Sequence, residues 1–162
     1  MNICSKVVPN PCVVVPNTVT TNKSIPKILI VTPTQHETVH MMTTKRVFKL
    51  FEIDSHKIIS NTEDIDAYNQ VSVKDICYYA DQNEYSAIMC YDNRSTETID
   101  SIAQSTIIPT IYIGNYLKPI IGNPVVIFSE DSSINAAIFL VQMLSLKYDS
   151  VMNKLQKMKL TK

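Results

Sequence analysis

The sequence predicts an α/β domain in which helices cover both faces of a mostly parallel, five-stranded sheet. Short apolar runs rich in β-branched residues alternate with segments whose apolar residues recur at helical spacing. This alternation is typical of a three-layer, doubly wound fold. The chain has 162 residues, the length of one domain. Apolar residues make up 45% and charged residues 19% of it, a composition that excludes a disordered chain and a coiled coil.

The chain begins with a proline-containing arm. Residues 1–25 hold Pro9, Pro11 and Pro16 among polar spacers, and proline interrupts both helices and sheets. We expect this arm to be either disordered or an extended segment lying on a neighbour. The α/β domain then occupies 26–162.

The spacing of the cysteines and the hydropathy indicate in which cellular compartment we expect the protein. Four cysteines lie far apart with no CxxC pair, so we expect neither a disulfide framework nor a zinc site. Cys77 and Cys90 lie in apolar segments and are predicted to be buried thiols. The arm lacks the continuous apolar core of a secretory signal, and no apolar run approaches a membrane span. We therefore expect a reducing, cytoplasmic compartment and no membrane partner.

Two strands and a helix open the domain. The continuous apolar run 27–32 predicts a strand covered on both faces, and Pro33 ends it. Residues 36–51 have apolar side chains near helical spacing. Residues 56–60 predict the second strand, and 61–69 are polar and turn-like.

Two further helix–strand pairs follow. Residues 72–82 predict a helix with Ser72 as its N-cap, and 85–90 predict the third strand. Residues 96–104 then predict a helix, and 107–113 the fourth strand.

The last strand and two helices end the chain. Residues 123–128 predict the fifth strand. The connection 114–122 is short for a parallel crossover, so the strand is either joined by a minimal crossover or antiparallel. Residues 134–147 predict a helix that is apolar nearly all round, for which a partner subunit is the expected cover of the second face. Residues 151–158 predict a final amphipathic helix.

Five such strands fit the flavodoxin-like order 2-1-3-4-5, in which ligands bind beyond the carboxyl ends of the first and third strands. Helix amides beginning near His36 would face an anion there. The other reading is that these are ordinary polar loops that cap helices. The candidate ligand-binding residues are Thr32, Thr34 and Gln35 after the first strand, Ser60, Asn61 and Thr62 after the second, and Asn93, Arg94 and Ser95 after the third.

Several classes of site are disfavoured. With two glycines, the chain has no GxGxxG motif, P-loop or GxSxG motif. Its net charge is zero and it contains two arginines, so a nucleic-acid partner is not expected. Residues 36–40 read HETVH and match the letters of the zinc-protease motif. They open a helix instead of lying within one, and no third ligand follows, so we expect no metal and no cofactor.

The last forty residues carry a family resemblance. The segment 122–131 reads GNPVVIFSED, 135–147 reads NAAIFLVQMLSLK, and 151–158 completes the pattern. Together they resemble the end of PurE, the carboxyaminoimidazole ribonucleotide mutase or aminoimidazole ribonucleotide carboxylase of purine biosynthesis. Residues 107–114 are similar to that family's fourth strand, and the resemblance extends over 27–159. It implies a PurE-like fold, a ribotide ligand, no cofactor, and a homo-octamer assembled through the C-terminal helices.

The chain departs from this family where the family's active site lies. The phosphate-binding pattern GSxSD corresponds to TPTQH at 32–36, and SAHR corresponds to SNTE at 60–63. The family's glycine-rich, histidine-bearing loop corresponds to 90–95, which has neither residue type. The family's reaction needs a histidine to shuttle a proton. Thr62 cannot do so, whereas His36 is a candidate catalytic residue.

Three hypotheses follow from the sequence. The first is a pseudoenzyme, a PurE-like domain that serves as an oligomeric binding or scaffold module. The second is a divergent aminoimidazole ribonucleotide carboxylase or mutase that works through His36. The third is an unrelated flavodoxin-like module that binds a nucleotide or a protein.

Overall fold

The computed structural model describes residues 24–60, 72–91, 97–115 and 125–160. These residues form five strands and five α-helices, with one 3₁₀ turn at Glu130–Ser132. The strands are β1 Lys27–Thr32, β2 Asp54–Ile59, β3 Ala87–Tyr91, β4 Thr110–Ile113 and β5 Val125–Phe128. The helices are α1 Val39–Leu50, α2 Val73–Gln82, α3 Glu97–Ser105, α4 Ser133–Ser145 and α5 Asp149–Leu160.

The sheet has the predicted order, β2-β1-β3-β4-β5, and every pair of neighbours is parallel. The direction of the fifth strand, which the sequence left open, is now fixed. Thr110 pairs with Val125 and Ile113 pairs with Phe128 in parallel register. The short connection between β4 and β5 is therefore a minimal crossover.

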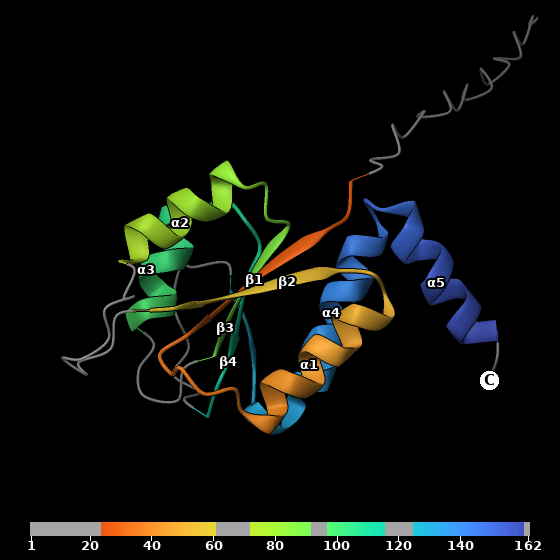
Figure 1. The fold of residues 1–162 in the computed structure, drawn as a ribbon, viewed down its shortest axis with the longest axis horizontal. Helices are drawn as coiled ribbons and strands as arrows, with labels where there is room; N and C mark the ends of the chain where they lie inside the picture. Colours follow the sequence, from red (N-terminus) through yellow and green to blue (C-terminus); the bar gives the residue numbers. More distant parts are fainter. Residues whose placement is uncertain (1–23, 61–71, 92–96, 116–124, 161–162) are drawn as a thin grey trace, which may run out of the picture.

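Two helical layers enclose the sheet. Helices α1 and α4 cover one face and α2 and α3 cover the other, as Figure 1 shows. Successive residues of β1 alternate between these layers, because side chains of a strand point to opposite faces. Ile28 and Ile30 pack towards α1 and α4, and Leu29 and Val31 pack towards α2 and α3. None of these four is more than 1% exposed, and each contributes about 1.5–3 kcal/mol to stability.

Helix α1 begins at Val39, three residues later than the prediction of a helix from His36. The physical reason is local hydrogen bonding. The Thr34 hydroxyl donates to the carbonyl of His36 over 3.1 Å, which holds this backbone in a turn. Thr38 is the N-cap, and its hydroxyl oxygen accepts from the Met41 amide at 3.2 Å.

Other boundaries shift slightly. The predicted cap of α2 is confirmed, since the Ser72 hydroxyl oxygen accepts from the Asp75 amide at 3.2 Å. Strand β2 begins earlier than predicted, at Asp54. Strand β4 begins later, at Thr110, because Pro109 precedes it and the Ile108 amide donates to the Thr106 hydroxyl instead of joining the ladder.

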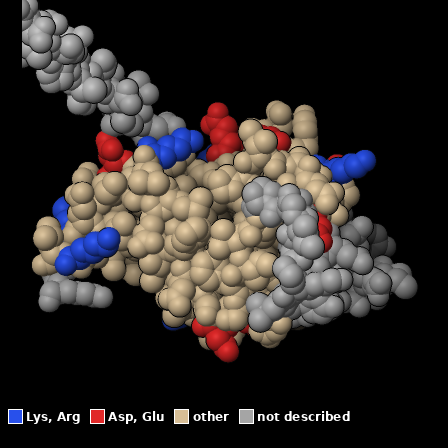
Figure 2. Space-filling model, turned by 180° about the vertical axis from the view of Figure 1, so that it is seen from behind, with Lys and Arg blue, Asp and Glu red and all other residues tan. Residues whose placement is uncertain are grey.

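Helix α4 keeps apolar side chains on its outer side. Its inner face is fully buried, with Ala136, Ala137 and Leu140 at 0% exposure. On its outer side Ile134 is 45% and Ile138 is 40% exposed. We call these two residues, with Val126 of β5 at 39% exposure, the outer apolar face. Figure 2 shows that much of the surface seen from behind carries few charged side chains.

Cys77 and Cys90 are buried as predicted, at 3% and 2% exposure. Within the described ranges, no helix is both long enough and apolar enough to cross a membrane.

Candidate functional site

The loop after β1 forms the centre of the candidate site, and its hydroxyls bond within the loop. Thr32, 2% exposed, accepts a hydrogen bond from the Thr34 amide at 3.3 Å. The two threonine hydroxyl oxygens are 3.2 Å apart. Because the Thr34 hydroxyl proton is given to the His36 carbonyl, Thr32 is the donor between the two hydroxyls. Both hydroxyl protons of this loop are therefore already used.

Strand β2 brings a cation to the same loop. The Lys57 ammonium donates to the backbone carbonyl of Gln35 over 2.5 Å. Sequence reasoning missed this residue, because a lysine on a strand gives no signal of the carbonyl that it reaches. The contact anchors the loop to the sheet and uses one of the three ammonium donors.

A carboxylate lies just before α1. Glu37 forms an ion pair with Lys45, which lies in the helix. The hydrogen bond from Lys45 is the main cause that lowers the pKa of Glu37. Burial acts in the opposite direction, and the charges of Lys45 and Lys57 lower the pKa further. A negative side chain thus precedes the first turn of α1, where Thr38 already caps the amide of Met41.

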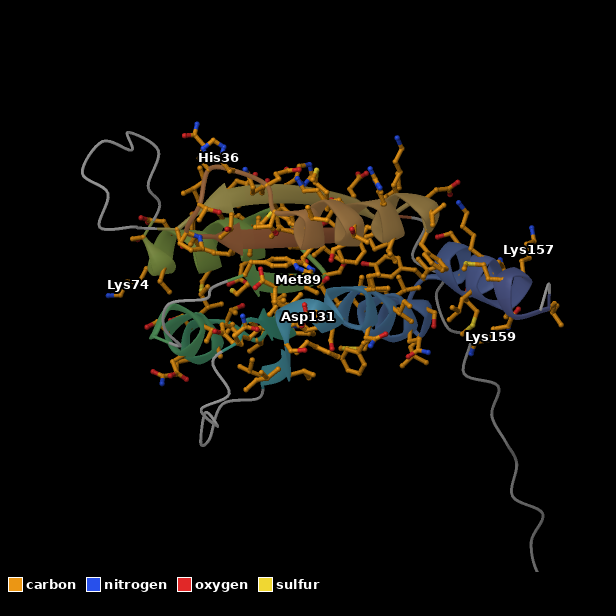
Figure 3. The ribbon with its side chains drawn as sticks, turned by 90° about the horizontal axis from the view of Figure 1, so that it is seen from below. His36, Lys74, Met89, Asp131, Lys157 and Lys159 are labelled. Atoms are coloured by element: carbon orange, nitrogen blue, oxygen red, sulfur yellow. The ribbon has the colours of Figure 1, made fainter. Side chains whose placement is uncertain are left out.

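His36 is exposed and projects outwards from the loop, as Figure 3 shows. It lies ahead of α1, whereas His40 lies in the first turn of that helix. The two histidines are therefore not one turn apart on a helix, the arrangement that a zinc protease requires. Among the described residues, no group of three or more His, Cys, Asp or Glu side chains is placed to hold a metal ion.

The ends of β1 and β2 meet at this edge as predicted. Ser60, 3% exposed, donates its amide to the Thr32 carbonyl over 2.9 Å. The structure thus brings together Thr32, Thr34 and Ser60. The other predicted site residues, Asn61, Thr62, Asn93, Arg94 and Ser95, lie outside the described residues.

Tyr91 ends β3 beneath the same edge. Its hydroxyl donates to Thr44 of α1 over 2.6 Å, and the Thr44 hydroxyl donates to the Ser133 carbonyl over 3.4 Å. Burial raises the pKa of Tyr91 to about 12, with a contrary effect of the Thr44 hydrogen bond and a smaller increase from Glu130. The sequence placed Tyr91 in a loop, and its neutral, buried hydroxyl instead ties β3 to α1 and α4.

The described part of the edge presents hydroxyls, a backbone turn, one lysine and an outward-facing imidazole. It offers polar contacts, and its donors are mostly engaged within the protein. A nucleophile activated by an adjacent base is not formed among the described residues.

The comparisons with known proteins concern the fold. No protein-family model and no curated protein matches the sequence. Among solved structures, PurE from Treponema denticola is similar with a TM-score of 0.66 and 13% identity over 84% of this chain and 90% of that chain. A point variant of PurE2 from the same organism has a TM-score of 0.67 and 13% identity, over 85% and 91% of the two chains. The chain thus has a PurE-like fold, a flavodoxin-like α/β arrangement with an all-parallel sheet of five strands.

Proposed function

We propose that this PurE-like domain has lost mutase and carboxylase catalysis and serves as an oligomeric binding or scaffold module. The observation that carries the proposal is the internal hydrogen bonding of the loop after β1. The resemblance to PurE assigns the ribotide phosphate to this loop, where the family has glycine and two serines. Here the hydroxyl protons of Thr32 and Thr34 are donated within the loop.

The physical reason lies in the free donors that a phosphate needs. A phosphate binds where backbone amides and hydroxyls point at it without another partner. In this loop the Thr34 amide donates to Thr32, and Lys57 donates to the Gln35 carbonyl. Recruiting the Thr34 amide or either threonine hydroxyl to a phosphate would break a bond within the loop, so the exchange of partners yields little net free energy.

The test is calorimetric titration of the full chain with aminoimidazole ribonucleotide, beside a mutase and carboxylase assay. We expect no saturable heat and no turnover from protein whose circular dichroism shows a folded α/β domain. An active PurE enzyme titrated in the same buffer serves as the positive control. Saturable binding would mean that the ribotide pocket survives, and measurable turnover would refute the loss of catalysis.

The alternative is a divergent aminoimidazole ribonucleotide carboxylase or mutase. The observation in its favour is that His36 is an accessible imidazole at the same sheet edge as Thr34 and Ser60, and imidazole exchanges protons near neutral pH. In this case His36→Ala would abolish turnover, and the control His40→Ala would preserve it. Full activity of His36→Ala would exclude the histidine role.

The proposed module is a homo-oligomer, an octamer if the resemblance holds. The support is the outer apolar face of Ile134, Ile138 and Val126. These large apolar side chains are 39–45% exposed on α4 and β5, two elements in contact, and exposed apolar surface marks contacts between subunits. A stable interface buries about 800 Å² per partner.

Light scattering after gel filtration tests the assembly. We expect the measured mass of the wild-type protein to lie well above the 18.3 kDa of a monomer. The Ile138→Lys variant should have the mass of a monomer. The control is Tyr78→Lys, because Tyr78 is 67% exposed on α2, which covers the opposite face of the sheet. A monomeric wild type at micromolar concentration would refute the assembly.

A further inference from the structure

Three aromatic side chains lie together beside β2, an edge strand of the sheet that the described residues form. The rings of His56 and Tyr85 meet edge to face at 5.7 Å between centroids, and Tyr79 meets Tyr85 at 5.7 Å. Tyr85 is buried, at 6% exposure, whereas Tyr79 is 41% exposed and His56 is exposed as well. We call these three residues the aromatic surface. It joins β2, an edge strand, to α2.

The N-terminal segment enters the described domain next to this surface. Ser24 and Ile25 line a cavity of about 560 Å³ together with Lys27 and Tyr85. Ile25 is 57% exposed. Tyr85 therefore borders both the cavity where the segment arrives and the two exposed rings of the aromatic surface.

The length of the segment suits this surface. The stretch 7–16 reads VVPNPCVVVP, and seven residues, 17–23, separate it from Ser24. Seven extended residues span at most about 25 Å. His56 and Tyr79 each lie one ring contact beyond Tyr85, well within that reach.

The amino-acid composition of the segment also suits the aromatic surface. Proline-rich stretches bind in grooves lined by aromatic rings, because their extended form is preset and little entropy is lost. The stretch 7–16 has three prolines and five valines and no charge. A short linker gives an effective concentration of about a millimolar, so even weak contacts suffice within one chain.

We propose that the stretch 7–16 lies across the aromatic surface of its own chain, with prolines against the rings of Tyr79 and His56. The surface is then an internal docking site for the arm, beyond the oligomeric role proposed above. Release of the arm would expose the rings of Tyr79 and His56.

Photocrosslinking of the full chain tests this placement. Cys77 and Cys90 are buried, so a benzophenone maleimide on the Cys4→Ser variant attaches preferentially at Cys12. Irradiation followed by mass spectrometry identifies the peptide that is joined to Cys12. We expect crosslinks to peptides that contain His56 or Tyr79, in product of single-chain mass.

Two neighbouring tyrosines provide the matched variants. Tyr78 and Tyr79 lie on one helix about 100° apart, and Tyr78 is 67% exposed and makes no ring contact with Tyr85 among the described residues. Tyr79→Ala should lower the crosslinked fraction about fivefold, the order expected for loss of one aromatic contact. Tyr79→Phe and Tyr78→Ala should leave it unchanged.

Three outcomes would overturn the proposal. One is crosslinking to peptides of α1 or α4 in place of β2 and α2. Another is equal loss in Tyr78→Ala and Tyr79→Ala. The third is product of two-chain mass alone, which would place the arm on a second copy.

Discussion

The buried hydroxyl of Tyr91 makes the stability of this domain sensitive to alkaline pH. Burial raises its pKa to about 12 in the folded chain, against about 10 in an unfolded chain. Between these values the unfolded state loses the proton and the folded state keeps it. The unfolded state then binds fewer protons, so the free energy of unfolding falls as pH rises. The contribution is fully present below pH 10 and is lost progressively above it.

The size of the effect follows from the two pKa values. With 1.36 kcal/mol per unit, the free energy of unfolding falls by about 1.4 kcal/mol by pH 11 through this group alone. Tyr91→Phe removes the titration and the hydrogen bond to Thr44. Losing that bond costs about 0.5–1.5 kcal/mol at pH 8. The variant is therefore less stable than wild type at pH 8 and close to it at pH 11.

Urea unfolding followed by circular dichroism at pH 8, 9, 10 and 11 measures the free energy of unfolding of wild type and of Tyr91→Phe at each pH. Burial also raises the pKa of Tyr85, with help from Tyr79, so the informative quantity is the difference between wild type and Tyr91→Phe. Tyr78→Phe, at an exposed tyrosine, is the control and should parallel wild type. A difference between wild type and Tyr91→Phe that stays constant from pH 8 to pH 11 would refute the reasoning.

Two further predictions concern stability at neutral pH. Thr38→Ala removes the cap of α1 and should cost about 1 kcal/mol in urea unfolding, whereas Thr43→Ala, which removes only a bond from an exposed hydroxyl to its own helix, should cost almost nothing; equal costs would contradict the capping role. Leu140 is 0% exposed, so Leu140→Ala should lower the free energy of unfolding by about 2–5 kcal/mol. Leu146 is 79% exposed, so Leu146→Ala should change that free energy by no more than about 0.5 kcal/mol. A small effect of Leu140→Ala would mean that the packing of α4 on the sheet is misplaced.

The fold was predictable because its signals are repeated and mutually consistent. A buried parallel strand needs an unbroken apolar run, and β1 supplies it from Ile28 to Val31. The start of α1 was predicted wrongly, since helical spacing does not show that Thr34 and Thr38 bond to the backbone. The direction of β5 was not predictable, because a connection of that length permits either pairing.

The meeting of strand ends at the candidate site was predictable, whereas the contacts of its side chains were not. Parallel strands end at one edge, so Thr32 and Ser60 were expected to meet, and a hydrogen bond joins their backbones. The contact of Lys57 with the Gln35 carbonyl depends on side-chain reach and on the shape of the loop. Neither is encoded in a spacing pattern, so the engagement of the loop's donors appears only in three dimensions.

The position of β1 also determines how the domain bears mechanical load. β1 is hydrogen-bonded to β2 on one side and to β3 on the other, and the N-terminal segment joins it at its amino end. A pull on that segment runs along the strand, so it shears both ladders together instead of opening one bond at a time. Resistance to such a pull is set by the unfolding rate. A tether on the arm would therefore load both ladders of β1 at once. Tension on the C-terminus would instead act first on α5, the last described helix.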